Sequence, residues 1–382
     1  MINITKTMKI ILISTLIAFS VCFVSLGISF VVEVVNNYSD EVDLGGGGGG
    51  KPTPQQPSTP AGNVTSEEGV KTGIKLPSVT QSKTYLGVTD DKTKDISAET
   101  SIKSAAVALI DITDNRTVAG KNMDTKIYPA SMTKVMTLLV ACENAKDPNA
   151  LLTVTEAMVQ KYNKSENKGA SVSFTWSIGD QVTVEDALHM VIYKSDTYAC
   201  WLLADYVAGG EAEFVDLMND KAGVLGLTST NFTNCTGLYN ENHYTTAREM
   251  SAIMAAVMNN ETATAVITRT DMYTADIYQN GEKNKTVSMW SDWYRGRLEE
   301  YKWGAAAAYY AGNGSDIKIV AGKTGWETVP TSCFVTSAYD DVTGRKYVCV
   351  QVGRIDKNQD SISPKISTDD TRLTYQKYAV EE

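Results

Sequence analysis

Strand-type sequences stand at both ends of the part of this chain that is able to fold, and helical sequences lie between them. The strand candidates are short, rich in apolar residues and bounded by turn-forming residues. They are residues 105–112 (AAVALIDI), 117–122, 317–325 (IKIVAGKTG), 333–340 (CFVTSAYD) and 346–353 (KYVCVQVG). We expect them to form one antiparallel sheet that brings the two ends of the domain together.

Helical patterns dominate the middle of the chain and return at its end. The expected helices span residues 131–143, 184–193, 197–207, 211–225, 246–258 and 371–380. We predict that the central helices form a lobe packed on one side of the sheet. The fold class is therefore α/β of the α+β type, and the folded domain is expected over residues 86–382.

The segment before this domain has the composition of a linker. Six consecutive glycines (45–50) are followed by KPTPQQPSTPAG. Glycine makes a chain flexible and proline stiffens it without adding a core. We expect residues 36–85 to be a stalk rather than part of a folded unit.

An apolar run at residues 10–35, within the predicted anchor at 9–35, is interrupted only by Glu33. It is long enough to span a bilayer and longer than the apolar core of most cleaved signal peptides. Lysines precede it and acidic residues follow it, so the positive-inside rule places residues 1–8 in the cytoplasm and the rest outside. The prediction is a single-pass signal anchor. A cleaved signal peptide is the alternative, and lipidation at Cys22 is a weaker one.

Composition removes several classes of function. The formal net charge of −10 argues against a nucleic-acid partner, because phosphate binding needs clustered Lys and Arg. Only two histidines, His189 and His243, are present, and no Cys/His cluster has zinc-site spacing. We therefore expect no metal and no cofactor. Five cysteines follow Cys22, and five cannot all pair within one chain.

The first motif that can support chemistry is Ser131-Met132-Thr133-Lys134, at the expected start of a helix. A serine there lies among free N–H groups and the positive end of the helix dipole, which favour an attacking oxyanion. Lys134 projects from the same face one turn later, and a desolvated lysine can act as the base that histidine supplies elsewhere. The same Ser-x-x-Lys spacing occurs at 165–168 and 315–318, but neither of these segments is expected to begin an apolar helix.

The second motif is Lys323-Thr324-Gly325, at the end of a strand candidate. The lysine and the hydroxyl can hold a substrate carboxylate, and the glycine allows close approach of the backbone. A solvated lysine at a strand-end turn is the structural alternative. The identical triplet at 71–73 lies inside the stalk and is discarded.

The third element is Ser195-Asp196-Thr197, between two expected helices. Ser195 can relay a proton between Lys134 and a leaving group. Taken alone, a serine before a helix is more often an N-cap.

Together with their flanking sequences, these motifs resemble the D-alanyl-D-alanine carboxypeptidases, the low-molecular-mass penicillin-binding proteins. The resemblance covers roughly residues 85–380. It is carried by YPASMTKVMT (128–137), residues 184–238, HYTTAREMSAIM (243–254), VAGKTGW (320–326), SCFVTSA (332–338) and DDTRLTYQKYA (369–379). It implies the penicillin-binding protein/β-lactamase-like fold and a bacterial enzyme whose catalytic domain lies outside the cytoplasm.

The resemblance also implies roles for individual residues. Ser131 is the acylated nucleophile, Lys134 its general base and Ser195 the relay to the leaving D-alanine. The implied substrate-binding residues are Thr197, Lys323, Thr324, Gly325 and Trp326, and the N–H groups of Ser131 and Trp326 form the oxyanion hole. The implied substrates are peptidoglycan pentapeptide stems, and β-lactams acylate the same serine. Endopeptidase and transpeptidase activities stay open.

This chain departs from the family pattern at two positions. Thr197 stands where the family has asparagine, and Glu327 stands where threonine is frequent. Two alternatives therefore stay open, a serine β-lactamase of the same fold and a binding or sensor protein impaired by these changes. The glutamate-containing loop of such β-lactamases (Glu-x-x-Leu-Asn) is absent between Ser195 and Lys323. His243 is expected to be structural.

Overall fold

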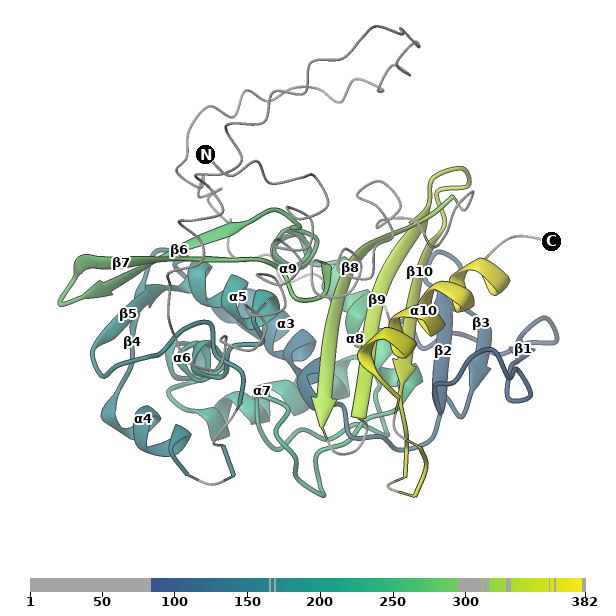
Figure 1. The fold of residues 1–382 in the computed structure, drawn as a ribbon, viewed down its shortest axis with the longest axis horizontal. Coiled ribbons are helices and arrows are strands. Elements are labelled where there is room, and N and C mark those ends of the chain that lie inside the picture. Colours follow the sequence, from purple (N-terminus) through teal and green to yellow (C-terminus); the bar gives the residue numbers. More distant parts are fainter. Residues whose placement is uncertain are drawn as a thin grey trace, which may run out of the picture. The chain divides into compact units, whose positions relative to one another are not determined.

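The computed structural model describes residues 84–379, with gaps at 165, 168–169, 295–310, 312–315, 328–330, 357 and 361 (Figure 1). The predicted anchor (9–35) and all but the last two residues of the predicted stalk (36–85) lie outside the described residues. Within the described part of the chain, no helix is long and apolar enough to cross a membrane.

The larger sheet joins the two ends of the domain, as the strand pattern predicts. Within the described residues its order is β1-β3-β2-β10-β9-β8. β2 pairs antiparallel with β10, so that Leu109 lies opposite Cys349. The strands are β1 (Lys94–Asp95), β2 (Ala106–Asp111), β3 (Arg116–Lys121), β8 (Ile317–Glu327), β9 (Thr331–Asp340) and β10 (Lys346–Val352). The predicted fold class is confirmed, and β8 is left as an edge strand.

Helices cover both faces of this sheet. α8 (Ala247–Met258) and α10 (Pro364–Tyr378) both pack on β9 and β10, and Figure 1 shows them on opposite sides of these strands. Every residue of β2 is buried, which explains why residues 106–110 are continuously apolar instead of alternating.

α10 begins seven residues before the predicted helix at 371–380. Ser363 caps it by accepting a hydrogen bond from the Ile366 N–H, and Pro364 occupies its first turn. Its buried face is mostly polar, with hydroxyls such as Thr371 and Thr374 bonded to backbone carbonyls one turn earlier. Apolar periodicity therefore missed its first half.

A second sheet corrects the prediction of a single sheet. Its order is β4-β5-β6-β7, formed by β4 (Leu151–Thr153), β5 (Asp180–Thr183), β6 (Tyr273–Gln279) and β7 (Glu282–Met289). β7 is mostly exposed and its sequence shows no apolar alternation, so hydrophobic periodicity did not predict this strand. Asn280 and Gly281 have φ of 53° and 80° and form the turn between β6 and β7. An Asn-Gly pair is the strongest short-range hairpin signal and could have identified it.

The helical lobe is built around α3, which is buried along almost its whole length. α3 packs against neighbours on several sides, α8 among them. The lobe helices are α3 (Lys134–Asn144), α4 (Glu156–Tyr162), α5 (Val184–Tyr193), α6 (Thr197–Ala208), α7 (Glu211–Val224) and α9 (Glu261–Ile267). In Figure 1 α3, α5 and α6 lie beside the β8 edge of the larger sheet, and this places helix starts next to the tip of β8.

Candidate active site

Seven of the eight predicted site residues line one cleft of about 480 Å³. Its walls come from the tip of β8, the turn before α3, the start of α6 and the loop at 236–238. The seven are Ser131, Lys134, Ser195, Thr197, Thr324, Gly325 and Trp326. Lys323 is the exception and lies behind the wall.

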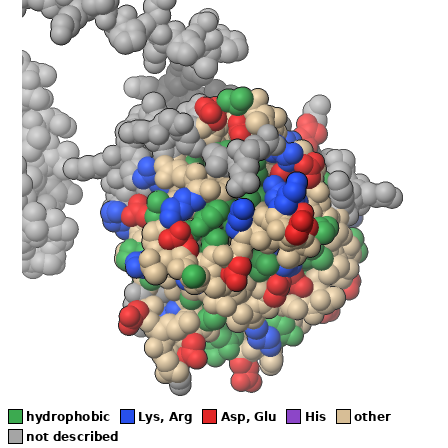
Figure 2. All heavy atoms as spheres, turned by 90° about the vertical axis from the view of Figure 1, so that its right-hand side faces the viewer, with side chains coloured by type: hydrophobic (Ala, Val, Ile, Leu, Met, Phe, Trp, Pro, Cys, Tyr) green, Lys and Arg blue, Asp and Glu red, His purple; other side chains and the backbone are tan. Residues whose placement is uncertain are grey.

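A larger cavity, of about 780 Å³, lies at the opposite end of the sheet near β1 and β3. Figure 2 shows basic and acidic side chains interspersed on this face. Its Arg345 pairs with Asp111 and Asp114, and its Lys377 lies 2.7 Å from Glu99. It contains none of the predicted site residues, so the smaller cleft is the candidate site.

Ser131 lies in a single 3₁₀ turn, Ala130–Thr133, and α3 begins directly after it at Lys134. The serine therefore precedes the α-helix instead of opening it. Lys134 Nζ lies 3.2 Å from Ser131 Oγ and donates to the Thr236 carbonyl at 2.5 Å. Burial lowers the pKa of Lys134, so a neutral amine that can accept the serine proton becomes accessible.

Two glycines let other segments approach this turn. A Cβ built on Gly325 would lie 3.2 Å from the Ser131 nitrogen and 2.5 Å from Cys333 Sγ. A Cβ on Gly237 would lie 1.9 Å from the Ala130 carbonyl oxygen, and Gly237 has φ of 80°. The predicted role of Gly325 in close approach fits this geometry, and Gly237 is a second such position that sequence reasoning missed.

Lys323 is only 1% exposed and donates to the Thr324 carbonyl at 2.8 Å. Burial, together with the positive charge of Lys134, lowers the pKa of Lys323 to about 7. Thr324 lines the cleft, whereas Lys323 is not among its lining residues. Lys323 therefore places a positive charge under the cleft without lining it.

The middle motif is arranged differently from a simple helix cap. Asp196 is the N-cap of α6 and accepts from the Ala199 N–H, the Ser173 N–H and the Trp176 indole. The capping interpretation of Ser195 is therefore wrong. Ser195 has φ of 57°, and its hydroxyl, in a side chain only 7% exposed, has no hydrogen-bond partner among the described residues. A buried hydroxyl without a partner at a cleft wall suits a group that bonds a bound molecule.

Several other residues that line or support the cleft were not predicted from the sequence. Asn234 Oδ1 accepts from the N–H groups of Thr236, Gly237 and Leu238, which fixes the loop whose carbonyl binds Lys134. The spacing Asn234-x-x-Gly237 favours a turn and could have indicated this loop from the sequence. The other missed lining residues are Glu166, Asn167, Ala170, Ser171, Thr236, Gly237, Leu238 and Asp292.

His243 takes the structural role expected of it. Its Nδ1 accepts from the Thr233 N–H at 3.1 Å, so its Nε2 carries the proton and donates to Thr133 Oγ1 at 2.8 Å. Burial lowers the pKa of His243 to about 4. The imidazole thus links the 233–243 segment to the turn that carries the serine.

The comparisons with known proteins agree with this geometry. Residues 92–308 match the model of the family described as D-alanyl-D-alanine carboxypeptidase. The chain is 34% identical over 194 residues to the D-alanyl-D-alanine carboxypeptidase DacC of Escherichia coli, covering 50% of this chain and 48% of DacC. It is 33% identical over 170 residues to DacF of Bacillus subtilis, covering 44% and 42%. The matches thus span about half, or less, of these curated relatives.

Solved structures with the same fold include the Streptomyces K15 DD-transpeptidase, with a TM-score of 0.57 and 23% identity over 72% of this chain and 95% of that one. Penicillin-binding protein 5 from Haemophilus influenzae has a TM-score of 0.54 and 23% identity, covering 72% and 70%. The fold and the matched family model together show that the chain belongs to the D-alanyl-D-alanine carboxypeptidase family.

Proposed function

We propose that this chain is a serine D-Ala-D-Ala carboxypeptidase that trims peptidoglycan stem peptides through an acyl-enzyme on Ser131. The observation that carries the proposal is the pairing of Ser131 Oγ with the buried Lys134 amine at 3.2 Å, inside a cleft bounded by the tip of β8. Family membership and the relatives named carboxypeptidases support the same reaction.

The proposed acylation step uses groups that line the cleft. Ser131 Oγ attacks the carbonyl of the penultimate D-alanine while neutral Lys134 accepts its proton. Ser195, whose hydroxyl has no partner in the described part of the chain, passes a proton to the departing amine. The N–H groups of Ser131 and Trp326 stabilise the oxyanion. Water then hydrolyses the acyl-enzyme and frees Ser131.

The terminal carboxylate of the substrate is proposed to lie at Thr324. Its hydroxyl can donate to the carboxylate, and Lys323 adds a positive charge from behind it at pH values below its pKa of about 7. Because β8 is the last strand of this sheet among the described residues, an extended peptide can pair with it through backbone hydrogen bonds. The proposed binding residues are Thr197, Lys323, Thr324, Gly325 and Trp326.

A direct test compares labelling with turnover. The folded protein is incubated with a fluorescent penicillin and, separately, with a peptide ending in D-Ala-D-Ala. We expect a stable adduct on Ser131 and release of D-alanine, both lost in Ser131→Ala. Lys134→Arg should slow both by about 10²–10⁴-fold, because guanidinium cannot act as the base. Ser315→Ala, in a second Ser-x-x-Lys sequence, is the matched control.

Two outcomes separate the alternatives. Rapid release of hydrolysed penicillin without D-alanine release would favour a β-lactamase. Folded protein that neither takes up penicillin nor releases D-alanine would favour a binding or sensor protein.

We further propose that residues 9–35 anchor the protein in the bacterial cell membrane, with residues 36–85 as a stalk and the catalytic domain outside the cytoplasm. The apolar run, its flanking charges and the Gly/Pro-rich segment support this arrangement. Full-length protein should sediment with membranes and need detergent for release, whereas a chain starting at residue 36 should be released without it. Recovery of both forms without detergent would contradict the proposal.

A further inference from the structure

The candidate cleft is unexpectedly acidic for a site that receives a peptide carboxylate. Three carboxylates line it, from Glu166, Asp292 and Glu327, and Lys134 is the only lysine or arginine among its described lining residues. Two of the carboxylates are already engaged. Asp292 lies 2.8 Å from Lys194 Nζ, and Glu166 has contacts of its own.

Glu327 differs from the other two. Among the described residues no hydrogen bond and no ion pair within 4 Å is found for its carboxylate, which acts on Lys134 only through its charge, and its side chain is only partly exposed. A partly desolvated carboxylate without a partner favours a cation that arrives from outside. The buried Ser195 hydroxyl lies on the same cleft and has no hydrogen-bond partner in the part of the chain that the structure describes, which independently indicates that a bound molecule completes this site.

The position of Glu327 on β8 indicates which part of a peptide it meets. If the terminal carboxylate lies at Thr324 and the reacting carbonyl at the Trp326 N–H, the amino side of the peptide runs on beyond Trp326. Glu327 is the next residue of the same edge strand, about 3 Å further along. The side chain that precedes the D-Ala-D-Ala pair therefore lies within reach of its carboxylate.

We propose that Glu327 is a specificity residue that selects peptides with a free side-chain ammonium on the residue preceding D-Ala-D-Ala. This inference rests on the proposed function and names its substrate class, a stem with an unmodified diamino acid. The carboxylate pairs with the ammonium in a cleft partly shielded from water, where such a pair is worth more than at an open surface. A stem whose amine is acylated lacks the charge and is bound less well.

The test uses two matched peptides, Nα-acetyl-L-Lys-D-Ala-D-Ala and its Nε-acetylated form, which differ only in the ammonium. We expect kcat/KM to favour the free amine by roughly five- to tenfold at low salt, with the preference shrinking as salt is raised. Glu327→Gln should bring the ratio close to one, and Glu327→Lys should invert it. Glu282→Gln, an exposed carboxylate on β7, is the control and should keep the wild-type ratio.

The ratio of kcat/KM for the two peptides is the informative quantity, because Glu327 also acts on the proposed catalytic base, Lys134. Its negative charge opposes the lowering of the Lys134 pKa, so replacing it alters the acylation rate of every substrate. Dividing the two kcat/KM values removes that common effect. A wild-type ratio near one, or the same ratio in wild type and Glu327→Gln, would overturn the inference.

A binding measurement separates this inference from the proposed function. The Kd values of both peptides are measured by calorimetry with Ser131→Ala, alone and combined with Glu327→Gln. Tighter binding of the free amine that depends on Glu327 supports the inference even if no D-alanine is released. Equal Kd values refute it even if both peptides are hydrolysed.

Discussion

Two buried lysines, Lys134 in the cleft and Lys323 behind its wall, have different roles. Each loses hydration on folding, and burial lowers the pKa of both Lys134 and Lys323. Lys134 contacts Ser131 and is suited to the neutral, proton-accepting state. Lys323 donates to the Thr324 carbonyl and, below its pKa of about 7, supplies a positive charge that attracts a carboxylate.

The lowered pKa of Lys323 leads to a prediction on pH. Since Lys323 has a pKa of about 7, its charge is lost as pH rises through that value. Acylation by a penicillin that carries its carboxylate should therefore decline above about pH 7. A penicillin methyl ester has no carboxylate and should lack this decline. Labelling rates of both compounds between pH 6 and 9 test the prediction, and identical profiles would contradict it.

At the scale of single elements, the start of α6 connects Ser195 to the 173–176 segment. Its N-cap, Asp196, also accepts hydrogen bonds from Ser173 and Trp176. Burial raises the pKa of Asp196, while these donors hold it down. The helix start, the 173–176 segment and the conformation of Ser195 therefore depend on one carboxylate.

Asp196→Ala should lower the free energy of unfolding by about 2–4 kcal/mol, because it removes a cap and leaves buried donors without an acceptor. It should also slow penicillin acylation, because Ser195 loses its support. Urea unfolding and labelling rates measure the two effects. Asp196→Asn keeps one acceptor oxygen and should lose less of both. Wild-type stability in Asp196→Ala would show that the network is not structural.

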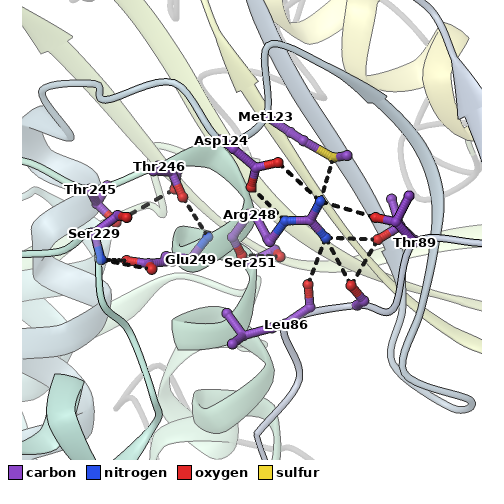
Figure 3. Close-up of polar contacts among 12 residues, drawn as sticks. Leu86, Thr89, Met123, Asp124, Ser229, Thr245, Thr246, Arg248, Glu249 and Ser251 are labelled. Carbon is purple, nitrogen blue, oxygen red and sulfur yellow. Dashed lines mark hydrogen bonds and ion pairs between the residues drawn. The ribbon is translucent and has the colours of Figure 1, made fainter.

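At the scale of the whole molecule, Arg248 on α8 fastens the beginning of the domain. It donates to the carbonyls of Leu86 and Gly87 and to Thr117 Oγ1, and it pairs with Asp124 (Figure 3). Gly87 further donates to the Asn115 side chain. The point where the predicted stalk would join the domain is thus bound to the body of the protein.

Arg248→Met should release residues 84–89, because the Leu86 and Gly87 carbonyls lose the guanidinium as a donor. Amide hydrogen exchange in this segment should rise markedly, with a loss of about 1–3 kcal/mol in the free energy of unfolding. Penicillin labelling should stay at the wild-type rate, since Arg248 is not part of the cleft. Unchanged exchange at Gly87 and Val88 would rule out this anchoring role.

The stability of the fold at acidic pH is also a property of the whole molecule. Burial lowers the pKa of His189 to about 3 and that of His243 to about 4, against 6.5 for an unburied histidine. The unfolded chain therefore binds more protons below pH 6.5, and stability falls from there down to about pH 3, the folded-state pKa of His189. The urea midpoint should drop between pH 6.5 and 5, and less steeply in His243→Gln. A midpoint independent of pH over this range would contradict the prediction.

The sequence by itself determined the features that depend on local spacing. Strand and helix periods identified β2, β8, β9 and β10 and most lobe helices to within a few residues. The three-residue spacing from Ser131 to Lys134 sufficed to place the amine beside the hydroxyl, because one helical turn separates them. These features follow from backbone geometry that each segment carries with it.

Only the tertiary structure decided what depends on contacts between distant segments. Lys134 bonds to Thr236, 102 positions away, and Gly237 is needed because its backbone meets Ala130. Nothing near Lys323 in the sequence indicates its burial, and nothing near Glu327 indicates that its carboxylate lies on the same cleft as Lys134. The charge and the burial of a site depend on every group that lies nearby in space. Many of these groups are distant in the sequence, so local spacing does not reveal them.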